Sequence, residues 1–146
     1  MRRYRCVLFL LLSIFGLTSS ASAQQVGSAG KQDSGFILEQ NYPNPFNPET
    51  KIPFGLFEDL FVDGKPVVVS IRIFNVLQQF ITAPTALNHP HGDGVPVLDL
   101  EYPYPGRFEA YWDGRDERGR QVASGVYFVQ LTVNGRTQFQ RMYVTK

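Results

Sequence analysis

The chain has 146 residues, a net charge of +1, 43% hydrophobic residues and a single cysteine, Cys6. This length suits one compact domain, because a second would be too small to bury its own core. The near-neutral charge excludes the strongly basic surface that nucleic-acid binding requires. With one cysteine there is no disulfide, so core packing must hold the fold together.

The first 23 residues have the three parts of a cleavable secretory signal peptide. Three arginines precede an apolar run at residues 6–17, and the segment ends in Ala21-Ser22-Ala23. The run of 12 residues is shorter than the roughly 20 that cross a bilayer, which disfavours a transmembrane anchor. We therefore expect export by the general secretory machinery, cleavage after Ala23 and a mature chain without a membrane span. Residues 24–35 are polar and rich in glycine and serine, as in a flexible linker.

From residue 36 onward the sequence is typical of an all-β domain. Residues 67–74 place aliphatic side chains at every odd position, and residues 126–133 alternate in the same way, which predicts strands with one buried face. Asn134-Gly135 separates the second of these runs from another alternating segment, residues 136–146. An Asn-Gly pair in that setting predicts a β-hairpin.

Further strands are predicted at residues 36–38, 50–56, 95–100 and 107–112. About seven short strands separated by turn residues predict a single immunoglobulin-like antiparallel β-sandwich over residues 36–146.

A proline-rich segment lies between the first two predicted strands. Its residues are Asn41, Tyr42, Pro43, Asn44, Pro45, Phe46, Asn47 and Pro48. Prolines fix φ and remove backbone donors, so we expect an extended strap that covers a sheet edge, anchored by Tyr42 and Phe46. The alternative is a ligand for a proline-recognising groove.

A second motif begins at Trp112, where a strand ends, and continues as Asp113-Gly114 into a loop that contains Asp116. The first carboxylate can accept hydrogen bonds from local amides, which favours a structural turn. The alternative is a calcium site made by Asp113, Asp116 and Glu117. Three arginines lie among these acids, and their spacing differs from the calcium-loop pattern, so we expect no metal here.

The third motif, Ala123-Ser124-Gly125-Val126-Tyr127, enters the penultimate strand. A tyrosine in this place resembles the tyrosine corner of sandwich domains, whose hydroxyl binds backbone across a corner. We interpret Tyr127 as a residue that stabilises the fold.

Residues 82–94 are predicted to form an exposed variable loop. The alternative is a transition-metal site, because His89 and His91 lie close to Asp93.

We find no activated thiol, phosphate-binding glycine loop or Gly-x-Ser-x-Gly elbow, and we expect no enzyme activity and no cofactor.

Together, residues 41–48, 112–128 and 142–146 resemble the C-terminal sorting domain of type IX secretion cargo. That domain is similar to the immunoglobulin-like domain of the flagellar hook-capping protein. The family opens with a Leu-x-x-Asn-Tyr-Pro-Asn-Pro-Phe-Asn-Pro strap, carries a Trp-Asp-Gly-x-Asp loop and an Ala-Ser-Gly-Val-Tyr-Phe strand, and ends in an apolar run and a basic residue, here Lys146. One departure is the turn at residues 77–79, Leu-Gln-Gln, where the family often has Leu-Gly-Arg.

The resemblance implies a non-catalytic address that brings the chain to the outer-membrane type IX translocon, and from there to the cell surface or medium. The terminal hairpin and Lys146 are expected to face the translocon. Only residues 24–35 separate the signal from the domain, so we expect no passenger. Two other functions stay open: a stand-alone structural or adhesive envelope protein, and a glycan-binding module that stacks sugars on Tyr102, Tyr104 and Tyr111.

Overall fold

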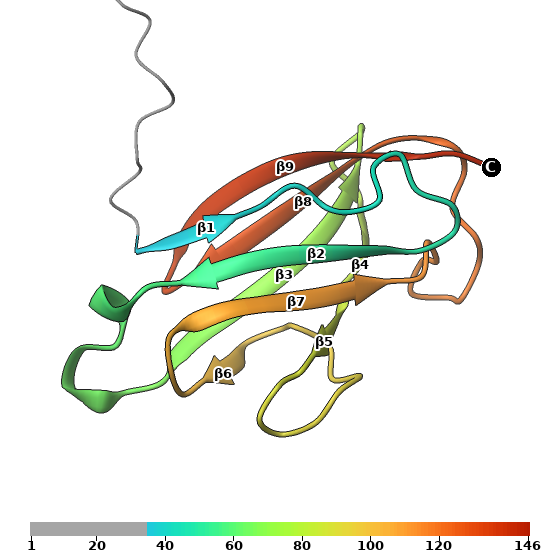
Figure 1. The fold of residues 1–146 in the computed structure, drawn as a ribbon. Helices are drawn as coiled ribbons and strands as arrows, with labels where there is room; N and C mark the ends of the chain where they lie inside the picture. The colour runs from blue at the N-terminus through green and yellow to red at the C-terminus, as the bar shows by residue number, and fades with distance from the viewer. Residues whose placement is uncertain (1–34) are drawn as a thin grey trace, which may run out of the picture. The chain divides into compact units, whose positions relative to one another are not determined.

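The computed structural model describes residues 35–146; the predicted signal peptide and most of the predicted linker lie outside these residues. Nine strands form two antiparallel sheets that pack face to face (Figure 1). The strands are β1 (Phe36–Leu38), β2 (Thr50–Leu56), β3 (Val67–Asn75), β4 (Phe80–Thr82), β5 (Thr85–Leu87), β6 (Leu100–Tyr102), β7 (Gly106–Trp112), β8 (Gly125–Val133) and β9 (Arg136–Val144). Two short 3-10 turns, Glu58–Leu60 and Val62–Gly64, connect β2 to β3.

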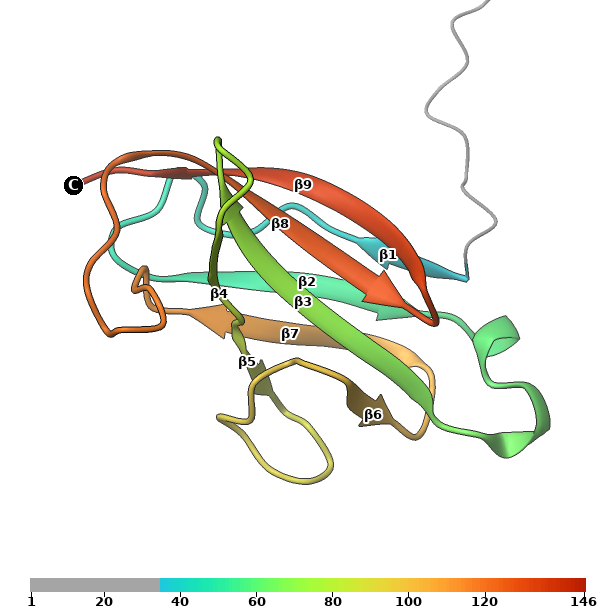
Figure 2. The ribbon, with the colours of Figure 1, turned by 180° about the vertical axis from the view of Figure 1, so that it is seen from behind.

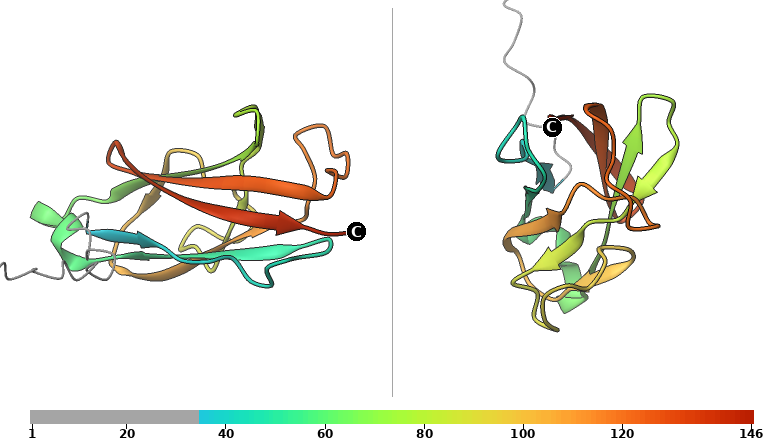
Figure 3. Two further views of the ribbon diagram at one scale, coloured as in Figure 1. Left: turned by 90° about the horizontal axis from the view of Figure 1, so that it is seen from above. Right: turned by 90° about the vertical axis from the view of Figure 1, so that its right-hand side faces the viewer.

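The strand order confirms the predicted immunoglobulin-like sandwich. One sheet, which we call sheet A, runs β1-β2-β7-β5, and the other, sheet B, runs β4-β3-β8-β9 with β6 paired to β3. If β1, β2, β3, β5, β7, β8 and β9 are lettered A to G, these orders become A-B-E-D and C-F-G, the arrangement of immunoglobulin domains, with β4 added beside β3. The left view of Figure 3 shows the two layers, with β8 and β9 in one and β1 and β2 in the other.

Period-two alternation builds the core between the sheets. The odd positions of β3, from Val67 to Ile73, are all buried, and so are the odd positions of β8 from Tyr127 to Val133. Neighbouring strands in register place such residues side by side on one face, so the two sheets bury matching apolar layers. The largest fully buried side chains include Trp112, Tyr102, Phe36, Phe46 and Phe54.

The predicted terminal hairpin is also confirmed. β8 and β9 pair from Gly125 opposite Val144 to Val133 opposite Arg136. Asn134 and Gly135 form the turn with φ angles of 48° and 79°. Both residue types tolerate positive φ, which explains why the pair ends one strand and starts the next.

The predicted strand at residues 95–100 is wrong. Residues 95–97 instead make isolated bonds to both sheets: Val95 O accepts from Ala86 N (2.7 Å), Val97 N donates to Pro84 O (2.9 Å) and Val97 O accepts from Ile71 N (2.7 Å). Pro96 has no N–H to give to a ladder, and Asp99 turns the chain with φ of 49° before β6 begins. The sequence prediction also missed β4 and β5, which have three residues each and show no alternation long enough to detect.

Candidate functional site

The proline-rich strap crosses from sheet A to sheet B at the end of the sandwich where the chain terminates (Figure 1). Tyr42 forms an antiparallel bridge with Lys51 in β2, and Phe46 forms a parallel bridge with Val144 in β9. Phe46 N donates to Tyr143 O (2.9 Å), and Phe46 O accepts from Thr145 N (3.0 Å). The strap therefore covers the outer edge of the last strand, as expected, although it bends through three cis X-Pro peptide bonds instead of staying extended.

Only one of the two predicted aromatic anchors is buried. Phe46 is 1% exposed, whereas Tyr42 is 43% exposed and donates its hydroxyl to the Glu109 carboxylate on the outer face of sheet A. Asn41 takes the anchoring place instead. Its buried amide donates to Thr50 Oγ1 (2.9 Å) and to Pro43 O (3.1 Å), so it fixes the bend at the start of the strap.

Three aromatic side chains, one from each sequence motif, meet behind the strap. The ring centroids of Phe46 and Trp112 lie 5.3 Å apart, and those of Trp112 and Tyr127 lie 5.7 Å apart, both in edge-to-face geometry. All three side chains are buried. Such pairs stabilise a fold beyond their buried area, by about 0.5–1.5 kcal/mol each. The three motifs are thus parts of one cluster, which we call the motif cluster.

Polar groups hold the members of the motif cluster in place. Trp112 Nε1 donates to Arg115 O (2.9 Å), which ties the indole to the following loop. The Tyr127 hydroxyl donates to Ala123 O (2.9 Å), four residues earlier, in the arrangement of a tyrosine corner. Ser124 is exposed just before β8, which begins at Gly125, and Lys146 is exposed beyond the end of β9.

The loop that follows Trp112 is a compact turn whose carboxylates bind its own amides. Asp113 Oδ1 accepts from Arg115 N (3.0 Å). Asp116 accepts from the backbone N–H groups of Arg118 and Arg120 and from the Arg120 guanidinium, each at 2.9 Å. The backbone bond from Arg120 is the largest of the contacts that hold the pKa of Asp116 below its ordinary value. This pattern is that of the structural turn rather than of a calcium loop, and residues 35–146 contain no group of three His, Cys, Asp or Glu side chains placed to hold a metal ion.

The expectation of a fully exposed histidine loop is wrong for His89, which is only 5% exposed. Its ring packs edge-on against Tyr102 with centroids 4.7 Å apart. Nδ1 accepts from His91 N (3.1 Å) and Nε2 lies 2.8 Å from Glu101 O, so the proton on Nε2 donates to that carbonyl. Both ring nitrogens are therefore engaged in bonds that fold the loop onto the core.

The glycan-stacking alternative fails at Tyr102. This ring is 0% exposed and packs against Phe54 and Phe108 inside the sandwich. Burial raises the pKa of its hydroxyl, which has no hydrogen-bond partner among the described residues. Tyr104 is exposed, and the hydroxyl of Tyr111 donates to Glu49 (2.5 Å), so the three tyrosines form no common platform.

Sequence reasoning missed a set of amide side chains that join the N-terminal segment to β9. Gln40 Nε2 donates to Arg141 O (3.0 Å), and Asn44 Oδ1 accepts from Tyr143 N (2.9 Å). Gln138, in β9, accepts from Leu38 N (2.8 Å) and donates to Phe36 O (2.9 Å). The partners lie about a hundred residues apart in sequence, and no local pattern marks them. They supply the bonds that a further strand would otherwise make.

The fold and the motif cluster define an immunoglobulin-like β-sandwich whose last strand is clamped by a proline-rich strap. No protein-family model and no curated protein matches the chain. Among solved structures, dimeric latent PorU from Porphyromonas gingivalis is similar over 75% of this chain, with 16% identity and a TM-score of 0.52. PorZ, described as an essential surface component of the type IX secretion system of the same organism, matches over 83% of this chain with 20% identity and a TM-score of 0.43.

These likenesses bear on the fold and not on activity. The chain corresponds to 9% of the length of PorU and to 13% of the length of PorZ. At 16% identity the similarity to PorU shows a shared sandwich fold, and the lower TM-score of the PorZ match adds nothing to that assignment. Within residues 35–146, no helix has the length and apolar character to cross a membrane.

Proposed function

We propose that this chain is a non-catalytic export protein whose sandwich, residues 36–146, acts as a type IX secretion address to or across the outer membrane. The observation that carries the proposal is the convergence of the three motifs. The strap, the Trp112 loop and the Tyr127 corner are separate in sequence, yet Phe46, Trp112 and Tyr127 pack together. That packing fixes Phe46, which bonds to the end of β9, the element that we expect to face the translocon.

The fold shared with a part of PorU supports the proposal at the level of architecture. The arrangement also fits an address rather than an enzyme, because the polar side chains of the motifs bind neighbouring backbone. Asn41, Asp113 and Asp116 each accept or donate within their own segment. In this proposal the sandwich passes the inner membrane by the general secretory route and meets translocon components in the periplasm while folded.

A reporter fusion tests this role. Residues 36–146 are placed after a periplasmic reporter in a host that has the type IX translocon, and the reporter is assayed in the periplasm, at the surface and in the medium. We expect export of the fusion, and no export when an immunoglobulin-like domain of the same size from another protein replaces residues 36–146. A folded fusion that stays in the periplasm contradicts the proposal.

A stand-alone structural or adhesive role in the envelope is the second candidate. The exposed aromatic outer face of sheet B favours it, because such faces mark interaction surfaces. In this case the fusion stays periplasmic, while the protein binds an envelope component through that face.

A further inference from the structure

Sheet B, whose strand β3 lies toward the viewer in Figure 2, carries aromatic side chains on its outer face where a solvated sheet would carry polar ones. Two cross-strand rows make up this surface. Phe80, Phe74, Phe128 and Arg141 are paired in turn across β4, β3, β8 and β9, and Arg72, Gln130 and Phe139 are paired across β3, β8 and β9. Directly paired residues lie on the same face about 5 Å apart, so the two rows form one contiguous patch. We call it the aromatic face.

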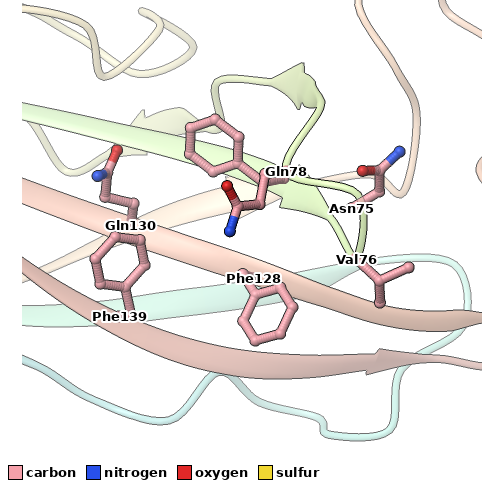
Figure 4. A pocket seen from close by; sticks show the side chains of 7 residues that line it. Asn75, Val76, Gln78, Phe128, Gln130 and Phe139 are labelled. Atoms are coloured by element: carbon pink, nitrogen blue, oxygen red, sulfur yellow. The ribbon is translucent and has the colours of Figure 1, made fainter.

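The aromatic face is hollowed between its two rows. A cavity of about 570 Å³ is lined by Phe74, Asn75, Val76, Gln78, Phe128, Gln130 and Phe139 (Figure 4). Phe139 is 57% exposed, and Val76 and Leu77 on the adjoining turn are 62% and 74% exposed. Apolar surface is exposed to water here, so its burial by a partner would stabilise the complex.

Among the described residues, no acidic side chain lines the hollow. The chain has no Asp or Glu at residues 67–82 or 118–146, the segments that contain β3, β4, β8 and β9. The acids of sheet B lie toward β6, where Glu101 is paired with Val68 and Asp99 accepts a hydrogen bond from Ser70. Arg72 and Arg141 stand at opposite corners of the aromatic face, and within residues 35–146 neither guanidinium forms an ion pair. The outer face of sheet A differs, because there Arg107 pairs with Glu39 (3.0 Å) and Lys51 with Glu109 (3.8 Å).

Several backbone edges of the sandwich are already occupied, which favours docking on the face. Ile81 O of β4 accepts from Glu117 N (3.1 Å), and the end of β9 is bonded to the strap. Ala86 of β5 bonds to residues 94 and 95. A partner that adds a strand would first have to displace these bonds.

We propose that the aromatic face binds an acidic polypeptide segment of another protein, which inserts an apolar side chain into the hollow and places carboxylates on Arg72 and Arg141. Aromatic and arginine side chains are the residues that carry most binding energy at protein interfaces. Carboxylates match the planar guanidinium fork, and opposite charge across an interface sets partner choice. A second copy of this chain would bring like charges together through the same face.

The polar side chains that line the hollow favour a polypeptide over a membrane surface. The hollow is lined by the amides of Gln78 and Gln130 beside the phenyl rings, while the amide of Asn75 is bonded to Gln79 within its own turn. Amide side chains can bond to peptide N–H and C=O groups around a buried side chain, which a lipid headgroup layer does not supply. The inference goes beyond the proposed export role and holds whether or not the reporter fusion is exported.

The test selects binders from a random peptide library displayed against the full chain, followed by affinity measurements with the individual synthetic peptides. We expect the selected peptides to combine an excess of Asp and Glu with at least one aromatic or large aliphatic residue. Arg72→Glu, Arg141→Glu and Phe139→Ser should each weaken binding about tenfold or more. Lys65→Glu makes the same charge change on an exposed residue before β3 and should alter affinity less than about twofold.

Other outcomes overturn the proposal. These are the absence of selected peptides, selected peptides without acidic excess, and equal binding by an Arg72→Glu/Arg141→Glu double variant whose unfolding midpoint matches the wild type. Arg141→Gln is a milder variant that keeps the test valid if charge reversal disturbs folding. Preferential binding of phosphatidylglycerol vesicles assigns the face to a membrane, and sedimentation as a dimer that Phe139→Ser abolishes assigns it to a second copy.

Discussion

Gly114 is the residue at which the strap and the Trp112 loop touch. Its φ is 73°, and a Cβ added there would lie 2.4 Å from Pro48 O. Gly114→Ala should therefore lower the free energy of unfolding by about 2 kcal/mol or more, the sum of positive-φ strain and a backbone clash. Gly119→Ala is the matched control in the same loop, because Gly119 has φ of 76° with open space around it. Urea unfolding of both variants measures the difference, and equal destabilisation would show that the contact with Pro48 contributes nothing.

Asp116 gives the same loop a dependence on pH. Its pKa in the folded protein lies below the ordinary value of 3.8, because backbone and side-chain N–H groups favour the carboxylate. The stability that this carboxylate contributes is therefore complete above pH 3.8 and is lost as pH falls through the folded pKa. We expect Asp116→Asn to be less stable than wild type near pH 7 and the gap to narrow below pH 4. Unfolding curves across pH check this, with Asp113→Asn as the control for charge; a constant gap would contradict it.

At the scale of elements, the strap acts as a partner strand for the end of β9. Asn44 Oδ1 accepts from Tyr143 N, and Phe46 provides one donor and one acceptor beyond it. Asn44→Ala leaves the Tyr143 amide without its acceptor and should cost about 1 kcal/mol. Hydrogen exchange should then quicken at Tyr143 and Thr145, while Val129 in the core keeps its protection. Asn47→Ala, an exposed residue of the same strap, is the control; unchanged exchange at Tyr143 would contradict the assigned role.

The long strands were predictable because their signal is local. Residues 67–74 and 126–133 alternate with period two, and Asn134-Gly135 encodes its own turn geometry. β4 pairs with the neighbouring β3, but its three residues are too few to show a period. Residues 95–97 were not predictable, because their bonds go to Pro84, Ala86 and Ile71 and not to one partner strand. The prediction for residues 95–100 failed since apolar content alone does not distinguish a strand from a segment that crosses between two sheets.

The candidate site also combines residues that local motifs identify with contacts that only the folded chain defines. The sequence motifs marked Phe46, Trp112 and Tyr127, and the structure places them in contact. The loop that contains His89 was expected to be exposed because of its proline and glycines, but tertiary packing buries the His89 ring against Tyr102. The aromatic face was hidden for another reason: Phe74 and Phe128 occupy even positions of strands whose odd positions form the core, and alternation does not tell what an outward aromatic residue contacts.

At the scale of residues 35–146, the sandwich is closed along two sides by irregular segments in place of a disulfide. The strap and Gln138 join sheet A to sheet B on the β1 and β9 side. Residues 95–97 join β5 to β3 on the opposite side. The right view of Figure 3 shows the strands of both sheets foreshortened. The first closure depends on β9, which also contributes buried side chains to the core, so loss of the last strand should open the structure.

Two truncations test this dependence and separate folding from export. Removal of residues 136–146 deletes the buried side chains of Met142 and Val144 and leaves the strap without its partner, so cooperative urea unfolding should disappear.

Removal of Lys146 alone takes away an exposed residue beyond β9, and the unfolding midpoint should stay unchanged. In the reporter fusion the same single deletion should reduce export, because the proposed function assigns recognition to the terminal hairpin and its last basic residue. A chain without Lys146 that is exported as well as wild type would remove that residue from the address, while cooperative unfolding after loss of β9 would show that the strap does not need its partner.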